Sequence, residues 1–282
     1  MNVRLHCRTK TLDLDAPVVM GILNVTPDSF SDGGQFTDVH SAVERIDVMI
    51  GQGAAIIDVG GESTRPGSDP VSLEEEIERT IPVLKKAVAE YPDTLFSIDT
   101  TKFEVAEQAL DAGAHIINDV SGLSKEPRLA RLCSETGTAY ICMHSQGNPK
   151  TMQKNPEYGD VVNEIYGFFK KRLSQLKAEG VKNVVLDPGI GFGKTLDHNL
   201  EIIAELRQFA TLQFPVLIGA SRKSMIGQLL DGRPADDRLA GTLAVHYHCL
   251  MNGASILRVH DVKEAADTVK IFNALKKKTN KP

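Results

Sequence analysis

The chain has 282 residues, of which 32 are Lys or Arg and 37 are Asp or Glu, so its formal net charge is −5 at pH 7. This mild acidity argues against general binding to nucleic acid, because contact with a phosphate backbone needs a dense basic surface. Hydrophobic residues make up 41% and charged residues 24% of the chain, which is typical of a globular protein. The length allows either two small domains or one barrel-sized domain.

The sequence carries no signal for export or for membrane insertion. Its first 15 residues lack the apolar segment and the cleavage pattern of a signal peptide, and no apolar run approaches the roughly 18 residues that a membrane helix requires. The four cysteines are scattered and form no C-x-x-C pair. We therefore expect a cytoplasmic protein with free thiols, no membrane partner and no zinc site.

Short apolar segments rich in Val and Ile recur along the chain and alternate with stretches long enough for helices. The segments are apolar on both faces, as buried parallel strands are. They cover residues 18–24, 55–59, 95–99, 115–118, 139–143, 184–187, 216–220 and 255–259. Among the stretches between them, residues 72–90 predict a helix, because three glutamates stand in its first turn.

Eight strands that alternate with helices over about 250 residues predict a (β/α)8 TIM barrel. A doubly wound open sheet is the alternative, although it usually has fewer strands at this length. No linker separates two halves of the chain, so we expect residues 1–282 to form one domain. Residues 1–16 precede the first barrel strand and predict a short N-terminal β-hairpin that closes the bottom of the barrel.

Polar residues stand at the ends of the predicted strands, and an internal repeat that begins with Gly-Ala places three of them in the same register. In a parallel barrel these ends meet at one mouth, where catalytic residues lie. With the residues that follow the last two strands, the mouth gathers Asn24, Asp99, Asn118, Asp187, Lys223, Arg258 and His260. The amides and carboxylates can pair with a heterocycle, and the cations can hold a polyanion. Buried unpaired charges are costly, so this number of polar groups at equivalent positions indicates a functional site.

Four loops after the strands have compositions that suit ligand binding. Two of them, at 24–34 and 60–67, are rich in Gly, Pro, Ser and Thr, and such loops can close over a ligand. The loop at 187–194 has the spacing of neither a Walker A motif nor a dinucleotide-binding motif, so its glycines predict tight turns beside Phe192. The loop at 219–224 places a hydroxyl and two cations directly after a buried strand.

The motifs at 20–34, 58–67, 187–194, 221–224 and 258–262 resemble those of the bacterial dihydropteroate synthase family. The resemblance implies a TIM barrel, usually a homodimer, that acts in folate biosynthesis. It implies that 6-hydroxymethyl-7,8-dihydropterin diphosphate and 4-aminobenzoate are converted to 7,8-dihydropteroate and diphosphate. It also implies that Mg²⁺ accompanies the diphosphate and that sulfonamides compete with aminobenzoate.

The same resemblance implies roles for individual residues. The pterin would contact Asp99, Asn118, Met143, Asp187 and Lys223. The diphosphate would contact Asn24, Thr64, Arg65, Arg258 and His260, with Asn24 also serving Mg²⁺. Aminobenzoate would contact Phe30, Pro66, Phe192 and Ser221. The residues expected to act in catalysis are Asp99, Lys223 and Arg65.

Three alternatives share parts of this pattern. The pterin-binding barrels of corrinoid methyltransferases hold methyl-tetrahydrofolate through similar Asp and Asn groups, but here the loops at 63–67 and 221–224 that serve diphosphate and aminobenzoate are present. An inactive paralogue would be expected to have lost at least one of four residues of the mouth, and all four are present here: Asp99, Lys223, Arg258 and His260. A phosphate-binding barrel of the aldolase type would need a Schiff-base lysine at the mouth, for which Lys223 is the one good candidate.

Overall fold

The computed structural model describes residues 4–25, 34–63, 68–147 and 152–279. Its strands are β1 (Arg4–Cys7), β2 (Lys10–Asp13), β3 (Val18–Asn24), β4 (Ile56–Gly60), β5 (Leu95–Asp99), β6 (Ile116–Asp119), β7 (Ala139–Met143), β8 (Val184–Asp187), β9 (Leu217–Ile218) and β10 (Ile256–Val259). Its helices are α1 (Gly34–Gly51), α2 (Leu73–Glu90), α3 (Phe103–Asp111), α4 (Arg128–Thr136), α5 (Val161–Ala178), α6 (Leu196–Ala204), α7 (Arg207–Ala210), α8 (Ser224–Leu229), α9 (Leu239–Met251) and α10 (Val262–Thr279), with a 3₁₀ turn at Ala235–Asp237.

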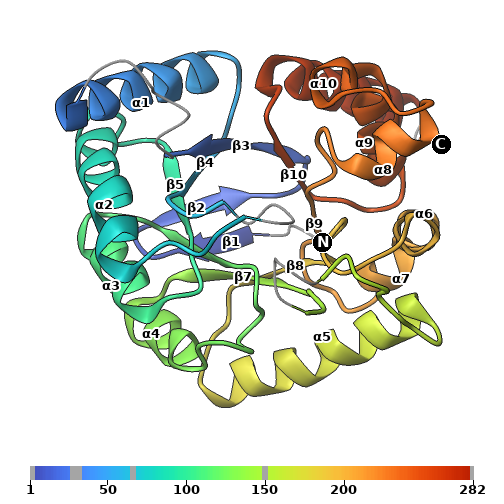
Figure 1. Cartoon of the computed structure of the whole chain (residues 1–282), viewed down its shortest axis with the longest axis horizontal. Helices are drawn as coiled ribbons and strands as arrows, with labels where there is room; N and C mark the ends of the chain where they lie inside the picture. The colour runs from blue at the N-terminus through green and yellow to red at the C-terminus, as the bar shows by residue number, and fades with distance from the viewer. Residues whose placement is uncertain (1–3, 26–33, 64–67, 148–151, 280–282) are drawn as a thin grey trace.

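Eight parallel strands form one sheet that curls into a barrel, and the helices surround it (Figure 1). The strand order is β8-β7-β6-β5-β4-β3-β10-β9, so neighbours in the chain are neighbours in the sheet. A parallel bridge between Leu186 and Val216 joins the two ends of this order. The predicted TIM barrel is thus confirmed, and the open doubly wound sheet is excluded.

The strand boundaries agree closely with the sequence pattern. Four of the predicted strands match β3, β5, β7 and β8 from end to end, and the other four begin one residue later than predicted. The residue before these later strands is still hydrogen-bonded to a neighbouring strand: for example, the Ala55 amide donates to Val19 O over 2.9 Å. The predicted helix at 72–90 is α2, with Ser72 as its N-cap accepting a hydrogen bond from the Glu75 amide.

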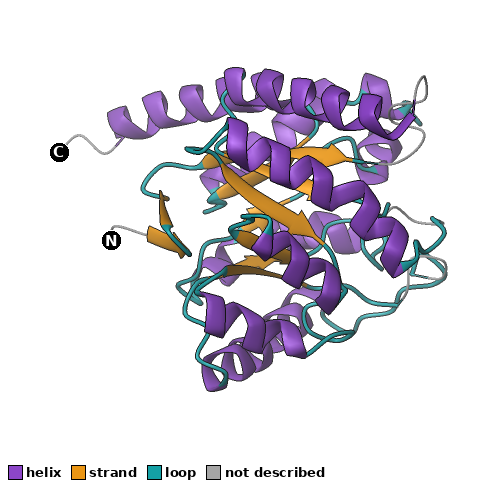
Figure 2. Ribbon diagram, turned by 90° about the vertical axis from the view of Figure 1, so that its left-hand side faces the viewer, coloured by secondary structure: helices purple, strands orange, loops and turns teal. Residues whose placement is uncertain are grey.

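The hairpin of β1 and β2 closes one end of the barrel, as the sequence predicts. The two strands pair in antiparallel register, and their alternation turns Leu5, Cys7 and Leu12 inward. These side chains are buried in one cluster with the inward-facing residues of the barrel strands, such as Met20 and Ile116. Figure 2 shows the hairpin beside the ends at which the strands begin. The opposite end, where the strands finish, is left for the site.

Two further sequence expectations concern the chain as a whole. All four cysteines are buried and free, as expected from their spacing. Within the described part of the chain, none of the helices combines the length and the apolar character needed to cross a lipid bilayer.

Candidate active site

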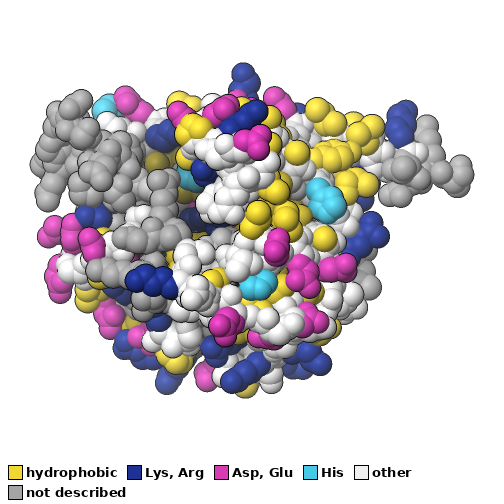
Figure 3. Space-filling model, turned by 45° about the vertical axis from the view of Figure 1, so that its right-hand side comes forward, with side chains coloured by type: hydrophobic (Ala, Val, Ile, Leu, Met, Phe, Trp, Pro, Cys, Tyr) yellow, Lys and Arg dark blue, Asp and Glu magenta, His cyan; other side chains and the backbone are white. Residues whose placement is uncertain are grey.

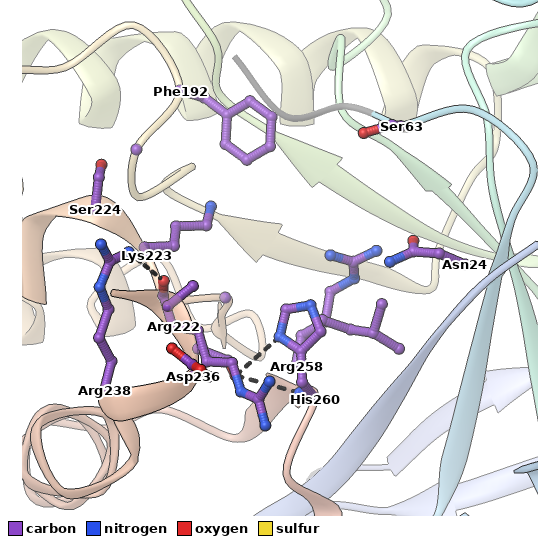
Figure 4. A pocket seen from close by; sticks show the side chains of 15 residues that line it. Asn24, Ser63, Phe192, Arg222, Lys223, Ser224, Asp236, Arg238, Arg258 and His260 are labelled. Atoms are coloured by element: carbon purple, nitrogen blue, oxygen red, sulfur yellow. Dashed lines mark hydrogen bonds between the residues drawn. The ribbon is translucent and has the colours of Figure 1, made fainter. Parts of the chain in front are cut away.

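A cavity of about 610 Å³ opens at the end of the barrel where the strands finish. Its wall is built from strand ends and from the loops that follow them, so residues far apart in sequence meet there (Figure 4). Six of the predicted site residues line it: Asn24, Phe192, Ser221, Lys223, Arg258 and His260. The cavity wall therefore combines cations, an amide, a hydroxyl and an aromatic ring, which suits a ligand with an anionic part and an aromatic part.

A buried charge network lies beneath this cavity and centres on Arg258. The Arg258 Nε donates to Asp58 Oδ2 over 2.6 Å, and its Nη2 donates to Asp99 Oδ2 over 2.7 Å. The Asn118 amide donates to the same oxygen of Asp58 over 3.0 Å. Asp58 is fully buried and Asp99 is 5% exposed. One guanidinium therefore neutralises two carboxylates that arrive from different strands, which is the pairing that buried charges require.

Asp58 belongs to this network although it is not among the predicted site residues. The sequence did carry a signal for it, because the internal repeat places Asp58, Asn118 and Arg258 in the same register at three strand ends. The structure shows why this register matters. The side chains of Asn118 and Arg258 both donate to Asp58 across the barrel, so Asp58 fixes the orientation of both of its partners.

The burial of the network makes Asp99 hard to ionise. Loss of water around the carboxyl raises the pKa of Asp99 to about 8, with a smaller contribution from the charge of Asp58, whereas Arg258 acts to lower it. The Oδ1 atoms of Asp58 and Asp99 have no hydrogen-bond partner among the described residues. A carboxylate in this state gains from any positive charge or donor that a ligand brings to it.

Lys223 and Asp187 form the neighbouring charged part of the site. The Lys223 ammonium contacts the Ile190 carbonyl and lies 4.1 Å from the centre of the Phe192 ring, and Figure 4 shows its side chain extending toward that ring. Burial lowers the pKa of Lys223 to about 7, and the charge of Asp187 opposes this change. Burial also raises the pKa of Asp187, whose Oδ1 accepts a hydrogen bond from the Gly189 amide over 2.7 Å.

The loops after β9 and β10 are tied together at the side of the cavity. Ser221 Oγ lies 3.1 Å from His260 Nδ1 and accepts a hydrogen bond from the His260 amide over 3.2 Å. The Arg222 Nε donates to Asp261 Oδ2 over 2.9 Å, and Arg222 has a φ of +57°. These contacts bring a residue predicted to bind aminobenzoate next to one predicted to bind diphosphate.

A second cavity of about 170 Å³ adjoins the first, and Phe192 lines both. Asp99 lines the second cavity together with Glu62, and the Glu62 carboxylate lies 2.5 Å from Lys102 Nζ. Lys102 also pairs with Glu76, which is 1% exposed. No motif in the sequence predicts this ion-pair cluster, because its three members belong to separate loops and helices.

The remaining predicted site residues fall into two groups. Asn118, Met143 and Asp187 are buried at strand ends and line neither cavity as described. The others lie outside the described residues: Phe30, Thr64, Arg65 and Pro66.

The expected magnesium site depends on Asn24. Within the described ranges, no group of three or more His, Cys, Asp or Glu side chains could hold a metal ion by itself. Mg²⁺ often binds through one or two protein oxygens, with substrate phosphates and water as its other ligands. The amide oxygen of Asn24, at the rim of the cation-lined cavity, fits this mode of binding and not that of a metal held by protein alone.

Comparison with known proteins gives the family. The model of the pterin binding enzyme family matches residues 20–260. The dihydropteroate synthase of Escherichia coli strain K12 is 48% identical over 282 residues, which cover 99% of each chain. The Xanthomonas albilineans dihydropteroate synthase with 4-aminobenzoic acid superimposes with a TM-score of 0.92 at 39% identity, over 100% of both chains. The complex of that enzyme with 7,8-dihydropteroate gives a TM-score of 0.88 at 38% identity, over 99% of this chain and 100% of the other. The chain therefore belongs to the pterin-binding enzyme family and, within it, to the dihydropteroate synthases.

Proposed function

We propose that the protein condenses 6-hydroxymethyl-7,8-dihydropterin diphosphate with 4-aminobenzoate to 7,8-dihydropteroate and diphosphate at the mouth of the barrel. The observation that carries this proposal is the Arg258 network, in which a cation that faces the cavity is paired with a buried carboxylate. A related synthase has been solved with 4-aminobenzoic acid and with 7,8-dihydropteroate. The reaction breaks the bond between the pterin methylene carbon and the diphosphate oxygen and forms a bond from that carbon to the aniline nitrogen.

The pterin would be read by the buried polar groups at the strand ends. Asp187 presents a carboxylate that can accept from the adjacent 2-amino and N3 donors of the pterin. Asn118 would read the other edge of the ring, and Lys223 would donate to the pterin carbonyl and a ring nitrogen. Asn118 and Asp187 lie at the ends of β6 and β8, where their burial strengthens each hydrogen bond. Lys223 lies between β9 and α8, directly before that helix. Met143 would pack against the ring.

The diphosphate would bind on the side of the cavity that carries Arg258 and His260. The guanidinium has five N–H donors, and the two contacts to Asp58 and Asp99 leave donors for an anion. Asn24 would hold Mg²⁺, which would neutralise charge on the leaving diphosphate. Thr64 and Arg65 would close over the same group, with Arg65 assisting its departure.

The proposed reaction does not require a strong general base. When diphosphate leaves, the positive charge on the methylene carbon is delocalised into the electron-rich dihydropterin, and the Asp99 carboxylate would stabilise it. The aniline nitrogen of aminobenzoate is neutral at pH 7 and attacks that carbon, after which its extra proton is lost to solvent. Phe192 and Ser221 would border the aminobenzoate, and Phe30 and Pro66 would add contacts from the two loops that exclude water.

We also propose a homodimer formed through α9 and α10. Three large hydrophobic residues on these helices, Met251, Ile271 and Leu275, are more than half exposed. Figure 3 shows hydrophobic side chains gathered on the right of the face that it displays. Burial of such a patch between two copies removes apolar surface from water.

The four buried free thiols fit a reducing cytoplasm.

The test of the proposed reaction is diphosphate release from the purified protein. The protein is mixed with the pterin diphosphate and Mg²⁺, with and without 4-aminobenzoate, and both diphosphate and 7,8-dihydropteroate are measured. We expect the two products to form in equal amounts and only when aminobenzoate is present. Diphosphate release that is independent of aminobenzoate would identify a hydrolase and contradict the proposal. Omission of Mg²⁺ tests the role of the metal separately.

A further inference from the structure

Lys194 is a buried cation to which the proposed reaction assigns no part. It ends the glycine-rich loop after β8 and is 2% exposed. Its ammonium nitrogen lies 3.0 Å from the Phe192 carbonyl oxygen, 3.1 Å from His144 Nδ1 and 3.4 Å from the His144 carbonyl oxygen. A lysine is almost never this buried unless its charge is matched, so these three contacts need an explanation.

The three contacts match the three donors of an ammonium group. Lys has three N–H donors when it is charged, and here each has an acceptor within reach. The His144 ring can accept because burial and the neighbouring Lys194 lower the pKa of His144 to about 3, so the ring is neutral. Burial lowers the pKa of Lys194 to about 7, and the nearby charge of Asp187 opposes this change.

These contacts connect two loops of the barrel mouth that also pack closely through their backbones. His144 directly follows β7, and Phe192 lies in the loop after β8. A β-carbon at Gly189 would lie 1.9 Å from the His144 carbonyl oxygen, and one at Gly193 would lie 2.2 Å from the Gln146 carbonyl oxygen. Lys194 therefore lies at the seam, the junction where the loop after β7 packs against the loop after β8, and it hydrogen-bonds to both loops.

The seam matters for function because it holds Phe192. The carbonyl of Phe192 accepts from Lys194, while its ring borders both cavities and lies 4.1 Å from the Lys223 ammonium. A shift of this residue would change the shape of the cavity in which aminobenzoate is proposed to bind.

We propose that Lys194 is a positioning residue, which links the Phe192 and His144 carbonyls and thereby fixes the Phe192 ring at the aminobenzoate cavity. The inference rests on the proposed function, since it assigns Phe192 to that substrate. Lys194 itself does not line either cavity as described, so it acts through Phe192. Loss of the ammonium is expected to leave the fold intact and to loosen the ring.

The test is a double-mutant cycle with Lys194→Met and Phe192→Leu, measured by steady-state kinetics. Met keeps the length and burial of Lys194 without its donors. A hydrogen bond to a charged group supports an expected rise of about tenfold or more in KM for 4-aminobenzoate. KM for the pterin diphosphate should change less than about twofold. In the Phe192→Leu background, Lys194→Met should add less than about twofold, because its target ring is already gone.

Two further variants keep the test sharp. Lys10→Met is the matched control, since Lys10 Nζ donates to the Thr94 carbonyl over 2.7 Å at the hairpin end of the barrel, and it should leave both KM values unchanged. If Lys194→Met does not fold, Tyr158→Phe removes a hydroxyl that donates to the Gly193 carbonyl over 3.0 Å. It should raise KM for aminobenzoate about threefold by loosening the same loop.

The outcomes separate the inference from the function on which it rests. A wild-type protein without aminobenzoate-dependent diphosphate release would contradict the proposed function. If the wild type is active, any of three results would overturn the positioning role alone. The effects of Lys194→Met and Phe192→Leu on the aminobenzoate KM could multiply, Lys194→Met could raise both KM values equally, or it could leave the aminobenzoate KM unchanged.

Discussion

Asp99→Asn should reduce kcat far more than it weakens binding of the pterin diphosphate. The amide is nearly isosteric with the carboxyl, and its oxygen can still accept from Arg258, which donates to Asp99 Oδ2 over 2.7 Å in the native protein. Because the pKa of Asp99 is raised to about 8, the variant and the native protein are compared at about pH 8, where a large share of the carboxyl is ionised. There the substitution removes only the negative charge beside the carbon on which positive charge develops. At about 5 Å and an effective dielectric constant of about 20, two unit charges interact by about 3 kcal/mol. That energy corresponds to a loss of roughly 200-fold in kcat.

The assay is diphosphate release at saturating aminobenzoate, with kcat and the pterin KM determined separately. A group that acts only in the transition state lowers kcat and leaves KM nearly constant. Thermal unfolding of the variant controls for damage to the fold. A kcat within threefold of wild type, or a pterin KM that rises as much as kcat falls, would refute the assignment of Asp99 to the developing cation.

Three further predictions follow from the geometry. The pH profile of kcat/KM should be bell-shaped. The carboxylate of Asp99 is lost as pH falls below its pKa of about 8, and the ammonium of Lys223 is lost as pH rises above its pKa of about 7. Lys223→Arg should remove the alkaline limb of the profile. Gly193→Ala should lower kcat/KM for aminobenzoate at least about tenfold, because a β-carbon at this position would lie 2.2 Å from a carbonyl oxygen. Gly137 has a similar positive φ but open space around it, so Gly137→Ala should reduce only stability. Equal kinetic losses in the two variants would argue against the contact. Leu5→Ala should lower the free energy of unfolding in urea by about 2–5 kcal/mol without changing kcat/KM, since Leu5 is 3% exposed in the cluster at the hairpin end.

The sequence predicts the barrel and its mouth well because both follow from local pattern. Each strand is a short apolar run, and parallel topology then forces every polar strand end to the same side. Asn24, Lys223, Arg258 and His260 were assigned to one cavity on this basis, and the structure places all four in its wall. Neither step requires knowledge of a specific side-chain contact.

The hydrogen-bond and ion-pair partners of the side chains at the barrel mouth could not be predicted from the sequence in the same way. Whether Arg258 bonds to Asp58, to Asp99 or to both depends on the diameter of the closed barrel and on side-chain rotamers. The contact between Lys194 and His144 likewise depends on how two loops pack. These are properties of the assembled structure, so the residue types alone leave several pairings open.

The sharing of Arg258 by two buried carboxylates limits which substitutions the protein can accept. Replacing Arg258 leaves Asp58 and Asp99 facing each other without a counter-charge, and removal of one partner from a buried pair costs about 3–5 kcal/mol. Such a loss is a large part of the stability of a typical domain. An inhibitor that depends on these three charges would therefore meet few tolerated escape mutations. One that depends on Ser224, an exposed residue at the rim of the same cavity, would meet many more.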